Sequence, residues 1–151
     1  APDPIRNIRE RFQAATDVVI RALTAVGVSS AVGEIPGEYC PGEFSVHHAG
    51  RIKLAGIGQR LGRSAAHVGG VLVISDSRAV RDVLDPTYEA LGIEWKPSTV
   101  GSVHDVAPGI SLEDVFGAIA NVVADDAQLI PTSIDQATLD RAAELAPQHL
   151  P

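Results

Sequence analysis

Cys40 and Lys53 are the two residues whose types and spacing could support nucleophilic chemistry. Cys40 lies in the segment 37–42, Gly-Glu-Tyr-Cys-Pro-Gly, where proline and glycine indicate a turn, so its thiol need not be buried in a core. Thiols react as thiolates, and a neighbouring cation stabilises that form. Lys53, expected on the next strand of a hairpin, could supply the charge. The competing interpretation makes Cys40 a small buried apolar residue with no reaction to perform.

Two glycines follow Lys53 closely along the same predicted strand. Gly56 and Gly58 indicate either a bulge or a ligand that approaches the backbone closely. A lysine beside such exposed backbone suits a carboxylate, a phosphate or a thioester carbonyl. The alternative is an ordinary edge strand that carries a solvated lysine.

The five histidines show no spacing typical of a metal site. His47 and His48 are adjacent in a predicted strand, so they point to opposite faces of the sheet. His67 precedes a buried strand and could line a site, whereas His104 and His149 have no partner at a metal-ligand spacing. A single cysteine also excludes an internal disulfide and a paired-cysteine zinc site. We therefore predict no metal.

One helix and a set of strands are expected to position these residues. Apolar residues recur at steps of three and four over residues 4–26, which predicts an amphipathic helix that Gly27 ends. Over residues 28–75 the pattern is that of short strands with tight turns, which predicts an antiparallel meander. Its strands are expected near residues 30–35, 44–49, 52–61 and 65–74.

The remaining residues, 76–151, are expected to be mainly helical. Residues 76–92 predict a helix, or two pieces broken at Pro86, and residues 97–108 predict a loop. Ser111 and Ser133 each show capping-box spacing before a helical pattern. The fold class is therefore α+β, a mixed or antiparallel sheet flanked by helices in a single domain over residues 1–151.

Composition narrows the classes of protein. The chain has 151 residues, 45% of them apolar, which is sufficient for one domain with a core. The net charge of −7, with no basic cluster, argues against nucleic acid as a partner. No apolar run reaches the roughly 18 residues of a membrane span. No secretory signal pattern is evident, so we expect a cytoplasmic protein.

Three motifs resemble the lipoate–protein ligase and octanoyl/lipoyl transferase family. They are Glu-Tyr-Cys-Pro-Gly at 38–42, Gly-Arg-Ile-Lys-Leu-Ala-Gly-Ile-Gly-Gln-Arg at 50–60, and Ala-His-Val-Gly-Gly-Val-Leu-Val at 66–73. The resemblance implies the catalytic fold shared with biotin ligases. It also implies attachment of octanoyl or lipoyl groups to a lysine of small lipoyl carrier domains.

The resemblance also suggests roles for individual residues. Lys53 matches the family lysine that contacts the acyl carbonyl or acyl-adenylate, and Cys40 matches the position where a cysteine-using branch forms an acyl thioester. His67 lies where family members often carry a histidine before a glycine. We predict Cys40 and Lys53 as catalytic residues. Substrate contacts are predicted at Gly42, Gly56, Gly58, Gln59, His67 and Gly69.

The predicted activity is acyl transfer through a thioester on Cys40, with lipoate or an octanoyl thioester as substrate and no permanently bound cofactor. One alternative is an ATP-dependent lipoate–protein ligase in which Cys40 is incidental. Another is a non-catalytic accessory domain that binds a carrier or a partner chain. The family's front half carries an arginine-containing triple-glycine loop that residues 1–36 do not match. The sequence thus resembles the back half, and we expect a front-half chain as a possible partner.

Overall fold

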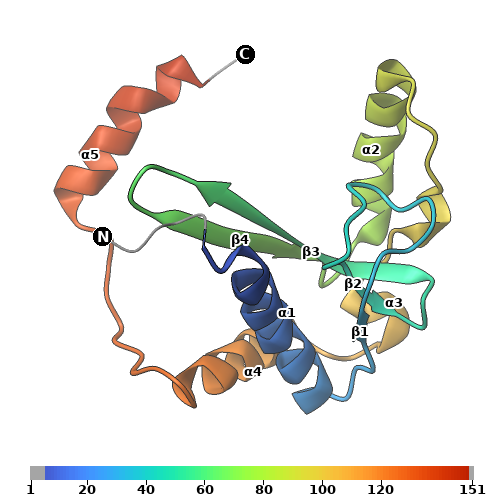
Figure 1. Ribbon diagram of the computed structural model, residues 1–151, viewed down its shortest axis with the longest axis horizontal. Helices are drawn as coiled ribbons and strands as arrows, with labels where there is room; N and C mark the ends of the chain where they lie inside the picture. The colour runs from blue at the N-terminus through green and yellow to red at the C-terminus, as the bar shows by residue number, and fades with distance from the viewer. Residues whose placement is uncertain (1–5, 150–151) are drawn as a thin grey trace.

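Four strands form a single sheet in the computed structural model, which describes residues 6–149 (Figure 1). They are β1 (Ala31–Val32), β2 (Val46–His48), β3 (Ile52–Leu61) and β4 (Ala66–Leu72), in that order across the sheet. Each neighbouring pair is antiparallel, which confirms the predicted meander. One isolated parallel bridge joins Lys53 to Val100 and gives the sheet a mixed element.

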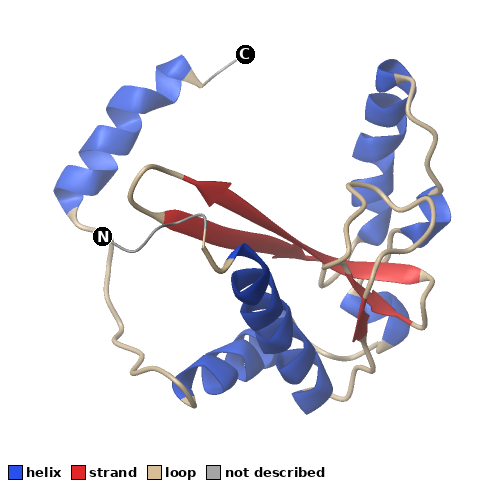
Figure 2. Cartoon of the chain, in the orientation of Figure 1, coloured by secondary structure: helices blue, strands red, loops and turns tan. Residues whose placement is uncertain are grey.

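Helix α1 (Ile8–Ala25) covers one face of this sheet and contacts all four strands. Helix α4 (Leu112–Ala124) packs beside α1, as Figure 2 shows. The core lies between these helices and the sheet, where Leu23, Leu54 and Val115 are almost completely buried. Burying each such side chain contributes about 1.5–3 kcal/mol, so this layer holds β3 in place.

The first helix begins later than the sequence predicts. Residue 4 lies outside the described residues, and residues 6 and 7 form a turn. Asn7 adopts a left-handed conformation (φ 62°), which interrupts the helical backbone immediately before Ile8. The predicted stop is confirmed, because Gly27 has a φ of 82° just after the last helical turn.

Helix α2 (Ser77–Leu91) runs through Pro86 as one helix and is not broken into two. The side chain of Asp76 accepts the Ala79 N–H at its start, and Gly92 ends it with a φ of 64°. The helix is continuous although Pro86 removes one internal hydrogen bond. In Figure 1, α2 stands at the end of the sheet where β3 begins.

The predicted loop over residues 97–108 is wrong in part. It contains the 3-10 helix η1 (Pro97–Thr99) and the short helix α3 (Val103–Val106). A reciprocal capping box between Ser102 and Asp105 starts α3, a local pairing that the Ser-rich composition concealed.

The last two helices differ in how they meet the rest of the chain. The capping box predicted at Ser111 is confirmed, with Asp114 as its second member. Helix α5 (Gln136–Leu145) is capped by Asp135, not by Ser133 as expected, because the Asp135 carboxylate accepts the Thr138 N–H. None of the α5 residues is buried, and the helix and η2 (Ala146–Gln148) lie apart from the sheet in Figure 1.

Among the described residues, no helix has both the length and the apolar character needed to cross a bilayer.

Candidate active site

Cys40 occupies a strained position in the loop between β1 and β2. Its φ is +41°, in the left-handed region, which costs a residue other than glycine about 1–2 kcal/mol. Two contacts from distant elements hold this conformation. The Cys40 N–H donates to the Tyr88 hydroxyl at 2.7 Å, and the Cys40 carbonyl accepts from Lys53 Nζ at 2.9 Å. The residue itself is exposed, so the alternative interpretation of Cys40 as a small buried residue is wrong.

Lys53 lies on β3 with only 1% of its side chain exposed, so the alternative of a solvated lysine is wrong. Its Nζ donates to the carbonyl oxygens of Tyr39 at 2.8 Å and Cys40 at 2.9 Å. The third oxygen nearby is Glu38 Oε2, at 3.3 Å. An ammonium has three N–H groups: two are used by the carbonyl oxygens, and the contact to Glu38 is an ion pair without a hydrogen bond. Lys53 therefore fastens the loop that carries Cys40.

Glu38 is a site residue that sequence reasoning missed. Its carboxylate is buried; Oε1 accepts from the Ser45 hydroxyl at 2.8 Å and from the Gly42 N–H at 3.3 Å. Oε2 makes no hydrogen bond and faces the Lys53 ammonium. Burying a carboxylate is costly unless an opposite charge compensates it, so Glu38 and Lys53 depend on one another. A glutamate in a Gly/Pro loop is ordinarily expected in solvent, and the one signal in the sequence was its place in the 38–42 motif.

The structure brings five of the predicted residues to a cavity of about 590 Å³. Cys40, Gly42, Lys53, Gly56 and Gly58 all line it. Apolar side chains make up much of the remaining wall, namely Ile8, Phe12, Phe44, Ile57 and Val71. The volume is within the range of small-molecule sites, and an apolar wall beside a thiol suits an acyl chain with a reactive head group.

Gly56 has a local reason to be glycine. A Cβ at this position would lie 3.3 Å from Lys53 Cε and 3.6 Å from Nζ. Gly56 therefore clears space for the lysine side chain itself, in addition to lining the cavity. A Cβ on Gly58 would meet no atom within 4 Å, so its backbone is open to the cavity.

Three predicted substrate contacts lie elsewhere. Gln59 fastens the start of α1, because its Nε2 donates to the Ile8 carbonyl at 2.6 Å and its Oε1 accepts from Arg11 Nε at 2.9 Å. His67 pairs across the hairpin with Arg60, near the turn that joins β3 to β4. Gly69 lines an adjoining apolar hollow of about 430 Å³ between β3, β4 and the two covering helices, which shares Ile57 and Val71 with the cavity at Cys40. Their roles in binding stay predictions.

The histidines of β2 have local partners. His47 Nδ1 accepts the Gly50 N–H at 3.2 Å, and His48 Nδ1 lies 2.7 Å from the Ser29 carbonyl. Over residues 6–149, no group of three or more His, Cys, Asp or Glu residues is arranged to hold a metal ion.

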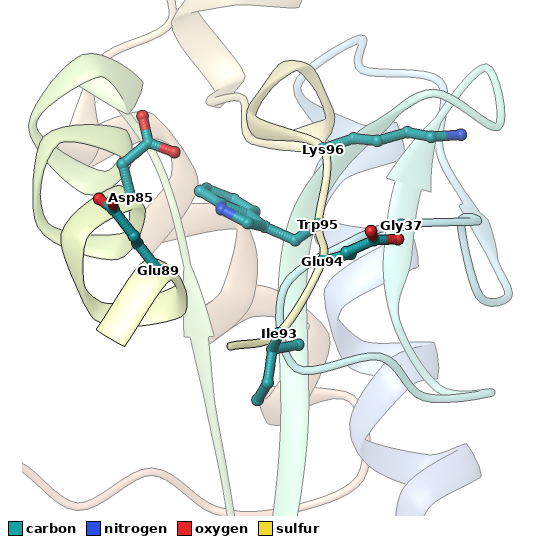
Figure 3. A pocket seen from close by; sticks show the side chains of 7 residues that line it. All are labelled: Gly37, Asp85, Glu89, Ile93, Glu94, Trp95 and Lys96. Atoms are coloured by element: carbon teal, nitrogen blue, oxygen red, sulfur yellow. The ribbon is translucent and has the colours of Figure 1, made fainter. Parts of the chain in front are cut away.

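A second hollow, of about 700 Å³, lies beside α2 and is shown in Figure 3. Asp85, Glu89 and Glu94 line it together with Trp95, whose indole is directed toward α2. The Lys96 ammonium extends away from the indole in this view. Among the described residues, no cysteine, serine or threonine lines this hollow, so the cavity at Cys40 is the candidate active site.

Titration of the tyrosines tests how strongly the site is buried. Burial raises the pKa of both Tyr39 and Tyr88 above the usual 10.0; the nearby Cys40 adds to the rise at Tyr39, whereas the Cys40 N–H bond to the Tyr88 hydroxyl opposes part of the rise in the pKa of Tyr88. The folded state therefore favours neutral phenols, and this contribution to stability is complete below pH 10 and lost as the pH rises through the folded-state pKa values.

We expect tyrosinate absorbance to appear at higher pH in the native protein than in urea. The chain has only two tyrosines, so the spectrum reports on this site alone, and superimposable curves would contradict the burial.

Solved structures of known proteins are similar to this chain in fold. A crystal structure of lipoate-protein ligase A bound with ATP superposes with a TM-score of 0.71 at 17% identity, over 93% of this chain and 56% of that chain. A T. acidophilum protein with bound lipoic acid gives a TM-score of 0.69 at 18% identity, over 98% and 57%. These likenesses confirm the predicted fold class, that of a lipoate ligase catalytic domain.

Sequence comparison identifies the family. The model of the lipoyl protein ligase A/B catalytic domain matches residues 2–124. An octanoyl-[GcvH]:protein N-octanoyltransferase from Geobacillus kaustophilus (strain HTA426) is 31% identical over 112 residues, which are 73% of this chain and 39% of the relative. The chain belongs to the lipoyl protein ligase A/B catalytic domain family, as the motifs indicated. It spans about two fifths of the length of this curated relative.

Proposed function

We propose that this chain takes part in the transfer of octanoyl or lipoyl groups to a lysine of a carrier domain, through a thioester on Cys40. The observation that carries the proposal is the exposed thiol at the wall of an apolar cavity, in a loop that Lys53 holds. Its G. kaustophilus relative is named as an octanoyltransferase between GcvH and a protein, which supports a carrier protein as partner. A free thiol is also consistent with a reducing compartment such as the cytoplasm.

The reaction divides into two steps. In the first, the Cys40 thiolate attacks the carbonyl carbon of the donor's acyl group; the C–S bond forms, the bond to the donor nitrogen or sulfur breaks, and that leaving atom takes up the thiol proton. In the second, the neutral ε-amine of the acceptor lysine attacks the thioester; the C–N bond forms, the C–S bond breaks, and the amine proton passes to sulfur. A covalent intermediate thus divides one difficult transfer into two easier ones.

Lys53 polarises the acyl carbonyl in this proposal. Of its three contacts, the one to Glu38 Oε2 is the longest, at 3.3 Å, and lacks hydrogen-bond geometry. The bonds to the Tyr39 and Cys40 carbonyls use two N–H groups, so the third is available to donate to a substrate oxygen placed within its reach. A buried, preorganised cation stabilises the negative charge that develops on that oxygen.

Intact mass spectrometry tests the proposal. We expect incubation with an octanoyl-loaded lipoyl domain to add one octanoyl group that hydroxylamine removes and that peptide mapping places on Cys40. The incubation is repeated with a candidate front-half chain, to establish which chains loading requires. No mass increment under either condition, with the fold intact, would reject the thioester mechanism.

An ATP-dependent lipoate–protein ligase is the second candidate, since the fold resembles that of lipoate-protein ligase A bound with ATP. In that case Cys40 is incidental, and lipoate and ATP serve as substrates with no permanently bound cofactor. Formation of lipoyl-adenylate that is unaffected by replacing Cys40 would favour the ligase over the transferase.

We also propose that a front-half partner covers β4. This strand is the last in the order of the sheet, and its Val71 is 67% exposed beside the apolar hollow. An exposed, partly apolar edge strand is a template for pairing with another segment. An accessory domain without activity of its own would bind such a partner or a lipoyl carrier yet form no acyl adduct alone. Size-exclusion chromatography of the mixed chains tests for the complex, and the acyl adduct measured by intact mass distinguishes a catalytic chain from an accessory domain.

A further inference from the structure

We infer that Tyr88 is the residue that positions Cys40 for acyl transfer, an inference that rests on the proposed function. Its hydroxyl accepts the Cys40 N–H at 2.7 Å and lies 3.8 Å from the Cys40 sulfur, to which it donates. Tyr88 does not line the cavity at Cys40. It therefore acts through Cys40 and not by contacting the acyl chain.

The surroundings of Tyr88 make it a rigid support. Only 9% of the residue is exposed, and its ring packs against the Trp95 indole with 5.0 Å between ring centroids. The segment that carries the indole is itself joined to the Cys40 loop, because the Lys96 N–H donates to the Gly37 carbonyl at 2.8 Å. The indole faces α2 in Figure 3. Helix, indole and loop therefore form one connected unit around the phenol.

The two contacts of the hydroxyl have different consequences for Cys40. Accepting the N–H fixes the backbone where φ is +41°, a conformation that a free loop would leave because it is strained. The hydroxyl can accept this bond and still donate its own hydrogen to the sulfur. A donor at the sulfur stabilises negative charge there, both in the thiolate before it attacks and on the sulfur as the C–S bond breaks.

The experiment compares wild type, Tyr88→Phe and Thr87→Val. The phenylalanine variant retains the ring beside Trp95 but loses both contacts to Cys40. Thr87→Val is the matched control, because it removes an exposed hydroxyl of the same helix whose hydrogen bond stays inside α2. Octanoyl loading of Cys40 and its alkylation by iodoacetamide are followed as rates, and fluorescence of Trp95, the only tryptophan, reports whether the fold is retained.

We expect Tyr88→Phe to slow octanoyl loading about tenfold at saturating donor, with the KM for the donor within about twofold and native fluorescence retained. Alkylation should slow by a similar factor, and Thr87→Val should match wild type in both. A merely structural role would alter the fluorescence, whereas a wild-type loading rate in Tyr88→Phe would overturn the inference. If wild type takes up no octanoyl group, the proposed function fails, and the alkylation rate alone then decides on Tyr88, an unchanged rate overturning it.

Discussion

Replacement of Cys40 by serine is expected to abolish the acyl adduct and to reduce acyl transfer on the order of 10³-fold or more. The alcohol that replaces the thiol is a much weaker nucleophile at neutral pH unless a base activates it. Within residues 6–149, no histidine lines the cavity at Cys40. Intact mass and a transfer assay to a lipoyl domain measure the two losses separately.

Cys40→Gly separates loss of chemistry from loss of folding. Glycine adopts the φ of +41° without the steric penalty of about 1–2 kcal/mol that cysteine bears, and this gain offsets its greater freedom in the unfolded chain. We therefore expect the variant to resist urea at least as well as wild type while forming no adduct. A persistent adduct in either variant would show that another residue carries the acyl group.

The second large effect is expected from Glu38→Gln, which should lower the free energy of unfolding by about 3–5 kcal/mol. Glutamine fills the same space and can still accept from Ser45, but it removes the negative charge that faces the buried Lys53 ammonium. The charge of Lys53 is then buried without compensation. Urea unfolding followed by Trp95 fluorescence measures the loss, and transfer activity should fall with it because Lys53 no longer holds its place.

Two further variants make this test specific. Glu43 lies in the same loop as Glu38 and forms an ion pair with Arg9 of α1, in which both side chains are more than 60% exposed. Glu43→Gln breaks this pair and should lower the free energy of unfolding by no more than about 1 kcal/mol. The double variant Glu38→Gln, Lys53→Met removes both buried charges and should recover part of the lost stability without recovering activity. Equal costs for Glu38→Gln and Glu43→Gln would contradict the dependence of Lys53 on Glu38.

Local pattern explains which elements were predictable. The strand expected at residues 52–61 coincides with β3, because the side-chain pattern of the strand and the turn residues on either side of it are local features of the sequence. The start of the first helix was misplaced, since the left-handed Asn7 is a single-residue feature that periodicity does not register. The sequence left open whether residues 76–92 form one helix or two, because an internal proline can either break a helix or be accommodated within it; the structure shows one helix.

Some features of the candidate site were likewise predictable from local sequence, and others were not. The sequence by itself determined a turn with an accessible thiol, a lysine on the following strand and glycines beside it, because each of these depends on neighbours within a few positions. Only the tertiary structure decided that Glu38 is buried against Lys53 and that Tyr88, 48 positions from Cys40, supports it. It also decided that Gln59 turns to α1 and away from the cavity. Such contacts join segments far apart in the chain, and packing the helices against the sheet is what brings those segments together.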